Sequence, residues 1–203
     1  DIKPDGSFKL DLSYFDYCTG LRMTNKKFHD LFGGAPRKPE DKLEQRHMDI
    51  ARSIQAVTET VMMKLASHVH EVTGLENLCL AGGVSLNCVS NGKILREGPF
   101  KNIWVQPAAS DAGGALGAAF VAWHEYLGGK RDADDVHDKQ KASLLGPSFT
   151  DEEIESYLIS EKIPYRRFKH ADIPDITAKL IADQKVIGWF QGRMEFGPRA
   201  LGS

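Results

Sequence analysis

Two glycine pairs, Gly82-Gly83 and Gly113-Gly114, place the strongest constraint on the fold of this chain. Each pair follows a short apolar run, 78–81 for the first and 103–105 for the second, and precedes a pattern typical of a helix. Glycine lets the backbone approach a ligand closely, and the N-terminus of a following helix favours anionic groups. Two such corners in succession predict an α/β fold with a nucleotide-binding site.

The longest helical pattern covers about residues 42–72, which contain neither proline nor glycine. Its apolar residues recur at helical spacing, and Gly74 is expected to end the helix. The strand at 77–81 is expected to be buried, and residues 28–39, which are rich in glycine and proline, are expected to form a loop. The other predicted elements are helices over 85–96, 111–127, 174–183 and from about 150, and strands over 7–13, 102–106 and 186–190.

Composition excludes several classes of protein. The formal net charge is −2, so neither nucleic acid nor an anionic membrane is an expected partner. No apolar run approaches the roughly 20 residues that a membrane-spanning helix needs. The three cysteines lack a metal-type spacing, which favours a reducing, cytoplasmic location over a disulfide scaffold. Because the chain begins without methionine and stops inside a glycine- and arginine-rich motif, we expect a piece of a longer protein.

The first glycine pair is a candidate nucleoside contact. A Gly-Gly backbone can lie flat against a purine ring, and Asn87 offers a hydrogen-bonding side chain in the helix that follows. Asparagine is a poor helix former, so its position near a helix start needs a reason. The alternative is a tight strand-to-helix turn that binds nothing. No phosphate-binding loop of the G-x-x-x-x-G-K-[ST] type occurs in the chain.

Asp111, just before the second glycine pair, has two interpretations. It is suited to be the N-cap of the following helix, which needs no ligand. The glycines behind it also open space beside the carboxylate, where a cation or a polyphosphate-bound metal can bind.

Arg193 and Arg199 flank a Gly-Pro turn near the end of the sequence. Guanidinium groups match phosphate geometry, and such a turn can aim both at one anion. A surface loop with a salt bridge through Glu195 explains the same residues without a ligand. The polar stretch 130–141 favours a solvated linker, and the seven histidines lack a shared ligand spacing, which favours packing or surface roles.

Five segments resemble the O-carbamoyltransferase family, whose members include nodulation protein U and the antibiotic carbamoyltransferases. They are SYFDYCTG (13–20), QRHMDIARSIQAVT (45–58), AGGVSLN (81–87), QPAASDAGGALGAA (106–119) and GWFQGRMEFGPRALG (188–202). The resemblance runs from about Ser13 to the last residue, and the last segment is highly specific for the family.

The resemblance implies a two-domain enzyme. Residues 1–130 would form the second half of an actin-like domain (the ribonuclease H-like fold of sugar kinases, heat-shock ATPases and actin), 131–145 a linker, and 146–203 the truncated start of a YrdC-like α/β domain. In the family, the YrdC-like domain condenses carbamoyl phosphate with ATP to give carbamoyladenylate and pyrophosphate. The actin-like domain then moves the carbamoyl group to a hydroxyl of a small-molecule acceptor. We expect the isolated chain to be inactive, because it would need the N-terminal half of the same protein.

Individual roles can be carried over to matching positions. The family's nucleotide-contacting residues would be Gly82, Gly83, Val84, Asn87 and Gly113. Asp111 matches a metal-ligating carboxylate, and Arg193 and Arg199 lie in the motif near the site of carbamoyl phosphate and ATP. The family completes an iron-type site with a His-x-x-x-His pair in the first half of the actin-like domain, and no such spacing occurs here. Because one carboxylate holds a transition metal poorly, iron or another divalent metal is expected only in the full-length protein.

Two other classes stay open. The chain can be the nucleotide-binding half of an actin-like ATPase or sugar kinase, in which Asp111 and the glycine corners hold a magnesium nucleotide. That interpretation leaves residues 193–201 without a role. The chain can also be a non-catalytic interaction module that uses the helix at 42–72 as a partner surface.

Overall fold

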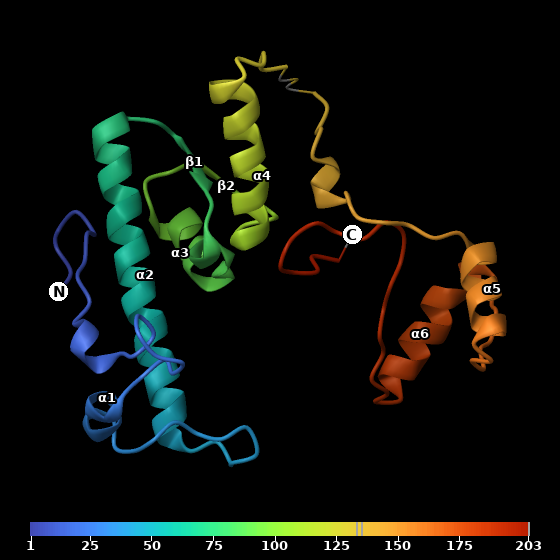
Figure 1. Ribbon diagram of the computed structural model, residues 1–203, viewed down its shortest axis with the longest axis horizontal. Coiled ribbons are helices and arrows are strands. Elements are labelled where there is room, and N and C mark those ends of the chain that lie inside the picture. The colour runs from blue at the N-terminus through green and yellow to red at the C-terminus, as the bar shows by residue number, and fades with distance from the viewer. Residues whose placement is uncertain (133, 135, 203) are drawn as a thin grey trace. The chain divides into compact units, whose positions relative to one another are not determined.

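The computed structural model describes residues 1–132, 134 and 136–202, and the chain forms two compact units, Asp1–Gln106 and Pro107–Ser203. The helices are α1 (Lys26–Leu31), α2 (Gln45–Thr73), α3 (Cys88–Glu97), α4 (Asp111–Val121), α5 (Asp151–Ser160) and α6 (Ile173–Ala182), and the strands are β1 (Asn77–Leu80) and β2 (Asn102–Val105) (Figure 1). This mixture of helices with a small parallel sheet fits the predicted α/β class.

Helix α2 is the main element of the first unit. Its 29 residues confirm the predicted long helix. It begins at a capping box in which Glu44 and His47 satisfy each other's backbone N–H groups. It ends at Gly74, whose φ of 66° is the left-handed conformation that glycine adopts without a steric penalty.

The core of the first unit lies where α2, α3 and the sheet meet. Strands β1 and β2 pair in parallel, and α3 forms the crossover between them. Ala66, Ile94 and Phe100 are buried together, and half-buried Leu78 and Ile103 pack against them. The two strands alternate between exposed and half-buried residues, so the prediction of a buried strand at 77–81 was wrong. The reason is that these core residues lie against one face of the sheet.

Two predictions near the N-terminus were also wrong. Residues 7–13 form no strand, since the only regular pairing there is an isolated bridge between Ile2 and Phe8. The Asp11 carboxylate instead accepts from the Ser13 N–H at 3.0 Å and caps a 3-10 turn, Leu12–Tyr14, and this local bond replaces a ladder bond. The predicted loop at 28–39 begins inside α1, which is capped by the side chain of Asn25.

The second unit contains α4, α5 and α6. Helix α4 runs on into one π-helical turn, Ala122–Tyr126, so the predicted helix at 111–127 is confirmed with a change of winding. The capping box between Thr150 and Glu153 confirms the predicted start of α5. Residues 186–190 were predicted as a strand, wrongly: Val186 is 99% exposed, and no described segment pairs with this stretch.

The predicted linker, 131–145, includes Ala133 and Asp135, which lie outside the described residues. The predicted domain boundaries stay a prediction. No helix in the described part of the chain is long and apolar enough to cross a membrane.

Candidate nucleotide and anion site

The first glycine pair forms a turn between β1 and α3. Gly82 has φ 86° and ψ 165°, a conformation that is essentially restricted to glycine. A Cβ added there would meet no atom within 4 Å, so the turn needs glycine for its backbone conformation and not for space. A 3-10 turn, Gly83–Leu86, follows, in which Val84 is 60% exposed and Ser85 is buried. The turn therefore presents open backbone and one exposed apolar side chain, that of Val84.

Asn87 connects this turn to α3. Its N–H donates to the carbonyl of Val84 at 3.0 Å, and its Oδ1 accepts from the Ser90 N–H at 3.0 Å. Asn87 is therefore the N-cap of α3, and the prediction that it lies within the helix was wrong. The cap position explains why asparagine, a poor helix former, stands here.

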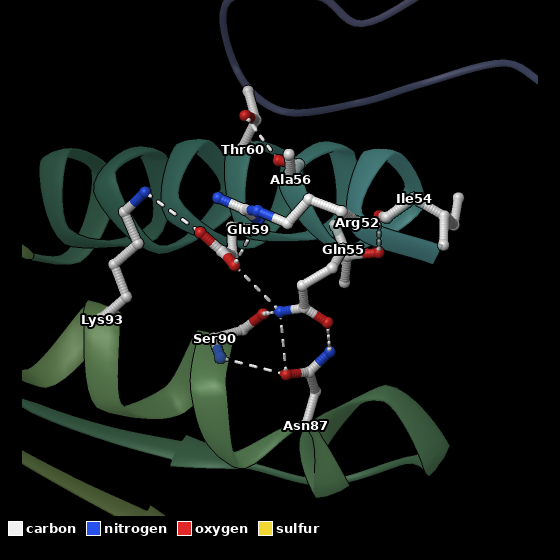
Figure 2. Close-up of polar contacts among 10 residues, drawn as sticks. Arg52, Ile54, Gln55, Ala56, Glu59, Thr60, Asn87, Ser90 and Lys93 are labelled. Carbon is white, nitrogen blue, oxygen red and sulfur yellow. Dashed lines mark hydrogen bonds and ion pairs between the residues drawn. The ribbon is translucent and has the colours of Figure 1, made fainter. Parts of the chain in front are cut away.

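A polar network joins Asn87 to α2 (Figure 2). Gln55 and Asn87 pair through their amides: Asn87 Nδ2 donates to Gln55 Oε1 at 2.8 Å, and Gln55 Nε2 donates to Asn87 Oδ1 at 3.2 Å. Gln55 Nε2 also donates to Glu59 at 3.0 Å. Glu59 forms ion pairs with Lys93 at 3.2 Å and Arg52 at 3.6 Å. The network ties the turn and the start of α3 to the long helix.

Glu59 is the charged centre of this network. Its side chain is only 10% exposed, which is unusual for a carboxylate unless it is paired. The hydrogen bond from Gln55, then that from Lys93, holds the pKa of Glu59 below its ordinary value of 4.5, against the opposing effect of desolvation. Glu59 is therefore ionised at neutral pH.

Sequence reasoning missed Gln55 and Glu59. The available signal was their spacing, because residues four apart lie on one helix face, and this face also carries the core residues Met62 and Ala66. Polar residues on an apolar face need partners, but the sequence did not show that Asn87, 32 positions away, supplies one.

Asp111 lies in the second unit as the first residue of α4. The N-cap position is taken by Ser110, whose side chain makes no capping bond, so the interpretation of Asp111 as the N-cap was wrong. Within the described residues, the exposed Asp111 carboxylate makes no hydrogen bond or ion pair. A Cβ added at Gly114 would meet nothing within 4 Å, so there is open space on this side of the helix.

The described residues do not form a metal centre. No group of three or more His, Cys, Asp or Glu side chains among them is arranged to hold a metal ion. Asp111 by itself does not fit a transition metal, which needs several ligands.

Arg193 and Arg199 line one pocket of about 340 Å³ in the second unit. Trp189 and Phe190 line the same pocket, so it combines aromatic surface with two guanidinium groups. Arg193 Nη1 donates to the carbonyl of Gly146 at 2.5 Å. The Glu195 carboxylate accepts from the N–H groups of residues 201 and 202 at 2.7 and 3.0 Å, which closes the turn that carries Arg199. The structure thus brings the two predicted arginines together.

This arginine-bearing tail packs against the loop before α4. A Cβ added at Gly197, where φ is 153°, would lie 3.0 Å from the carbonyl oxygen of Pro107 and 3.2 Å from Cα of Ala108. Ala108 and Ala109 are 0% and 1% exposed. The tail and the loop that leads to Asp111 therefore meet through backbone, at a contact that an added Cβ would crowd.

The candidate residues fall into two sets. Gly82, Gly83, Val84 and Asn87 belong to the first unit, and Asp111, Gly113, Arg193 and Arg199 belong to the second. A comparison with protein families matches both sets: the model described as carbamoyltransferase N-terminus covers residues 1–120, and the model described as carbamoyltransferase C-terminus covers residues 178–203. The chain belongs to the carbamoyltransferase family. The first match includes the glycine corners and Asp111, and the second includes both arginines.

Individual relatives agree with this membership. An uncharacterized protein of Synechocystis, sll1178, is 58% identical over 100% of this chain, which corresponds to 33% of the relative. Nodulation protein NolNO of Sinorhizobium fredii is 43% identical over 78% of this chain and 23% of the relative. Nodulation protein NolO of Bradyrhizobium diazoefficiens is 42% identical over 78% of this chain and 28% of the relative. The chain therefore spans a third or less of the length of these relatives.

Proposed function

We propose that the full-length protein is an ATP-dependent O-carbamoyltransferase that activates the carbamoyl group as carbamoyladenylate. The observation that carries this proposal is the occurrence of both carbamoyltransferase matches in one chain, with the two tail arginines lining one pocket. A pocket with two guanidinium groups and aromatic surface suits a nucleotide or an acyl phosphate.

The proposed reaction has two stages. Carbamoyl phosphate and water give carbamate and phosphate. A carbamate oxygen then attacks the α-phosphorus of ATP, and the bond to pyrophosphate breaks. In the second stage, a hydroxyl oxygen of a small-molecule acceptor attacks the carbamoyl carbon, the bond to the adenylate oxygen breaks, AMP leaves, and the hydroxyl proton is lost.

Each set of candidate residues has a role in this proposal. Arg193 and Arg199 bind the phosphate groups of carbamoyl phosphate and ATP during the first stage, and their positive charge offsets the charge that develops on the leaving group. The residues of the first unit proposed to contact the nucleoside are Gly82, Gly83, Val84 and Asn87. Asn87 also holds the start of α3 in place, because its side chain is the N-cap of that helix. Gly113 provides room for the nucleotide beside α4.

The proposal routes no step through a metal. Asp111 is proposed as one ligand of a divalent metal, iron in particular, whose other ligands lie outside this chain. This role fits the exposure of its carboxylate but needs the rest of the protein.

The test is carbamoyl-phosphate-dependent exchange between pyrophosphate and ATP, measured with the full-length protein. Arg199→Lys keeps the charge but removes the two-pronged geometry, so it should raise the KM for carbamoyl phosphate by roughly tenfold or more. Arg167→Lys is the matched control, because Arg167 is an exposed arginine of the same unit that is paired with Glu155 and Asp151. Exchange that does not depend on carbamoyl phosphate would contradict the proposal, and ATP cleavage to ADP without any pyrophosphate exchange would favour an actin-like ATPase.

The isolated chain of 203 residues is proposed to be inactive. The same exchange assay on the isolated chain should give only the rate of a sample without enzyme. Measurable exchange would show that the chain holds a complete adenylation site and would contradict this part of the proposal.

A further inference from the structure

Gln55 has no role in the proposed chemistry, yet it makes four polar contacts. Two join its amide to that of Asn87, and the others run from Nε2 to Glu59 at 3.0 Å and to the Ser90 hydroxyl at 3.3 Å. Figure 2 shows Gln55 reaching from α2 between Glu59 above and Asn87 below. A side chain that connects two helices in this way fixes their relative position at one point.

The network also has a direction. An ionised carboxylate only accepts hydrogen bonds, so Glu59 requires the Nε2 end of Gln55 to face it. The Oε1 end of Gln55 then faces Nδ2 of Asn87, which turns Oδ1 of Asn87 to the Ser90 N–H. A flipped Asn87 amide would place an NH2 group against that N–H, and two donors would face each other. Glu59, through Gln55, and the Ser90 N–H thus favour the same orientation of the Asn87 amide.

We propose that Gln55, oriented by Glu59, is a positioning residue for the Gly82–Asn87 turn. The inference rests on the proposed function, in which this turn contacts the nucleoside of ATP. Asn87 ends the turn through its N–H bond to Val84 and begins α3 through its side chain. Holding the Asn87 amide in one orientation therefore holds the turn in the shape that receives the ligand, before the ligand arrives.

The test compares Gln55→Ala with Gln45→Ala in the full-length protein. Gln45 is the matched control, because it lies on the same helix and also donates to an acidic residue four positions later, Asp49, but it touches no residue of the turn. Gln55→Ala should speed amide hydrogen exchange in residues 83–91 without ligand and raise the KM for ATP about fivefold, while kcat changes less than twofold. Gln45→Ala should change neither quantity.

Moving the carboxylate from position 59 to position 55 distinguishes a positioning role of Gln55 from a role in packing. Gln55→Glu keeps the shape and the acceptor for Asn87, but it places a carboxylate against Glu59, so the KM for ATP should rise at least as much as in Gln55→Ala. The double variant Gln55→Glu with Glu59→Gln restores one donor between positions 55 and 59. We expect it to recover part of the lost ATP affinity, which a defect of packing alone would not do.

Each outcome decides. If Gln55→Ala leaves amide hydrogen exchange in residues 83–91 unchanged, the positioning role is overturned, whether or not the protein uses ATP. If amide hydrogen exchange is faster but the KM for ATP is unchanged, Gln55 serves stability alone, and the positioning role is again overturned. If the wild-type protein shows no carbamoyl-phosphate-dependent exchange of pyrophosphate with ATP, the proposed function fails, and the inference about the nucleoside fails with it. The amide hydrogen exchange data still report whether Gln55 holds the turn.

Discussion

Replacement of Gly82 by alanine isolates the cost of a backbone conformation. Gly82 has φ 86° and ψ 165°, and the added methyl group would meet nothing within 4 Å. Holding a residue with a Cβ in this region costs about 1–3 kcal/mol. Alanine also restricts the unfolded chain, which returns about 0.4–1 kcal/mol. We therefore expect Gly82→Ala to lower the free energy of unfolding of the first unit by about 1.3 kcal/mol, the difference between the midpoints of these two ranges.

Gly74 and Gly117 allow the effect of backbone conformation to be compared without a steric clash, because an alanine Cβ would meet nothing within 4 Å at either position. Gly117 has helical dihedral angles inside α4, so Gly117→Ala should stabilise its unit by about 0.5–1 kcal/mol. Gly74 has φ 66° in the left-handed helical region, so Gly74→Ala should cost about 1 kcal/mol. Gly117→Ala is expected to be more stable than wild type, and both Gly74→Ala and Gly82→Ala are expected to be less stable than wild type.

The measurement is amide hydrogen exchange by mass spectrometry on the full-length protein, which reports each unit separately. Protection of residues 77–94 gives the effect of Gly82→Ala, and protection along α4 gives that of Gly117→Ala. The ATP KM of Gly82→Ala should rise as well, since the relaxed turn no longer presents a flat backbone. A Gly82→Ala protein with wild-type protection and wild-type ATP KM would refute the idea that the turn depends on a conformation specific to glycine.

Three further predictions concern the core, the network and the tail. Ile94 is 1% exposed, so Ile94→Ala should cost about 2–5 kcal/mol and Ile94→Val about 0.5–1.5 kcal/mol, measured as lost protection of β1 and α3; equal costs would contradict close packing. The pKa of Glu59 is lowered by folding, so its stabilising effect is present above its ordinary pKa of 4.5 and is lost as the pH falls through the folded value. The protection difference between wild type and Glu59→Gln should therefore shrink in acid, and a constant difference from pH 7 to pH 3 would refute this. Gly197→Ala would place its Cβ 3.0 Å from the Pro107 oxygen, so protease cleavage near residues 107–110 should accelerate, and an unchanged cleavage rate would show that the contact is dispensable.

The sequence predicted the long helix and the first glycine corner because the signals for them are local, whereas the second glycine pair, Gly113-Gly114, lies inside α4 and forms no corner. Residues 42–72 carry the helical period and lack breakers, and the two β-turn-α patterns each fit within a few residues. The failed strand at 186–190 shows the limit of such reasoning. Its residues favour extended structure, but a strand also needs a neighbouring strand to satisfy its N–H and C=O groups. The sequence of the segment alone does not tell whether such a neighbouring strand exists.

In the candidate site, too, features with a local sequence signal could be predicted and features that depend on distant residues could not. Arg193 and Arg199 could be predicted as a pair because a short turn joins them, and they do line one pocket. Asn87 was identified as important for a ligand, whereas the structure shows its side chain engaged by Ser90 and Gln55. The sequence indicated that asparagine needed a partner at this position, but it did not reveal that the partner is 32 residues away on α2.

The contact between Gly197 and the loop before α4 joins two segments with separate family matches. Pro107 and Ala108 lie within the carbamoyltransferase N-terminal match, and Gly197 lies within the C-terminal match, two residues before Arg199. A backbone contact of this kind leaves little freedom, since the neighbours of the added Cβ are main-chain atoms that cannot rotate away. The loop continues directly into Asp111, so the contact links the arginine-bearing turn to the start of α4. In the proposed enzyme, this contact would keep the anion pocket in register with the helix that carries the proposed metal ligand.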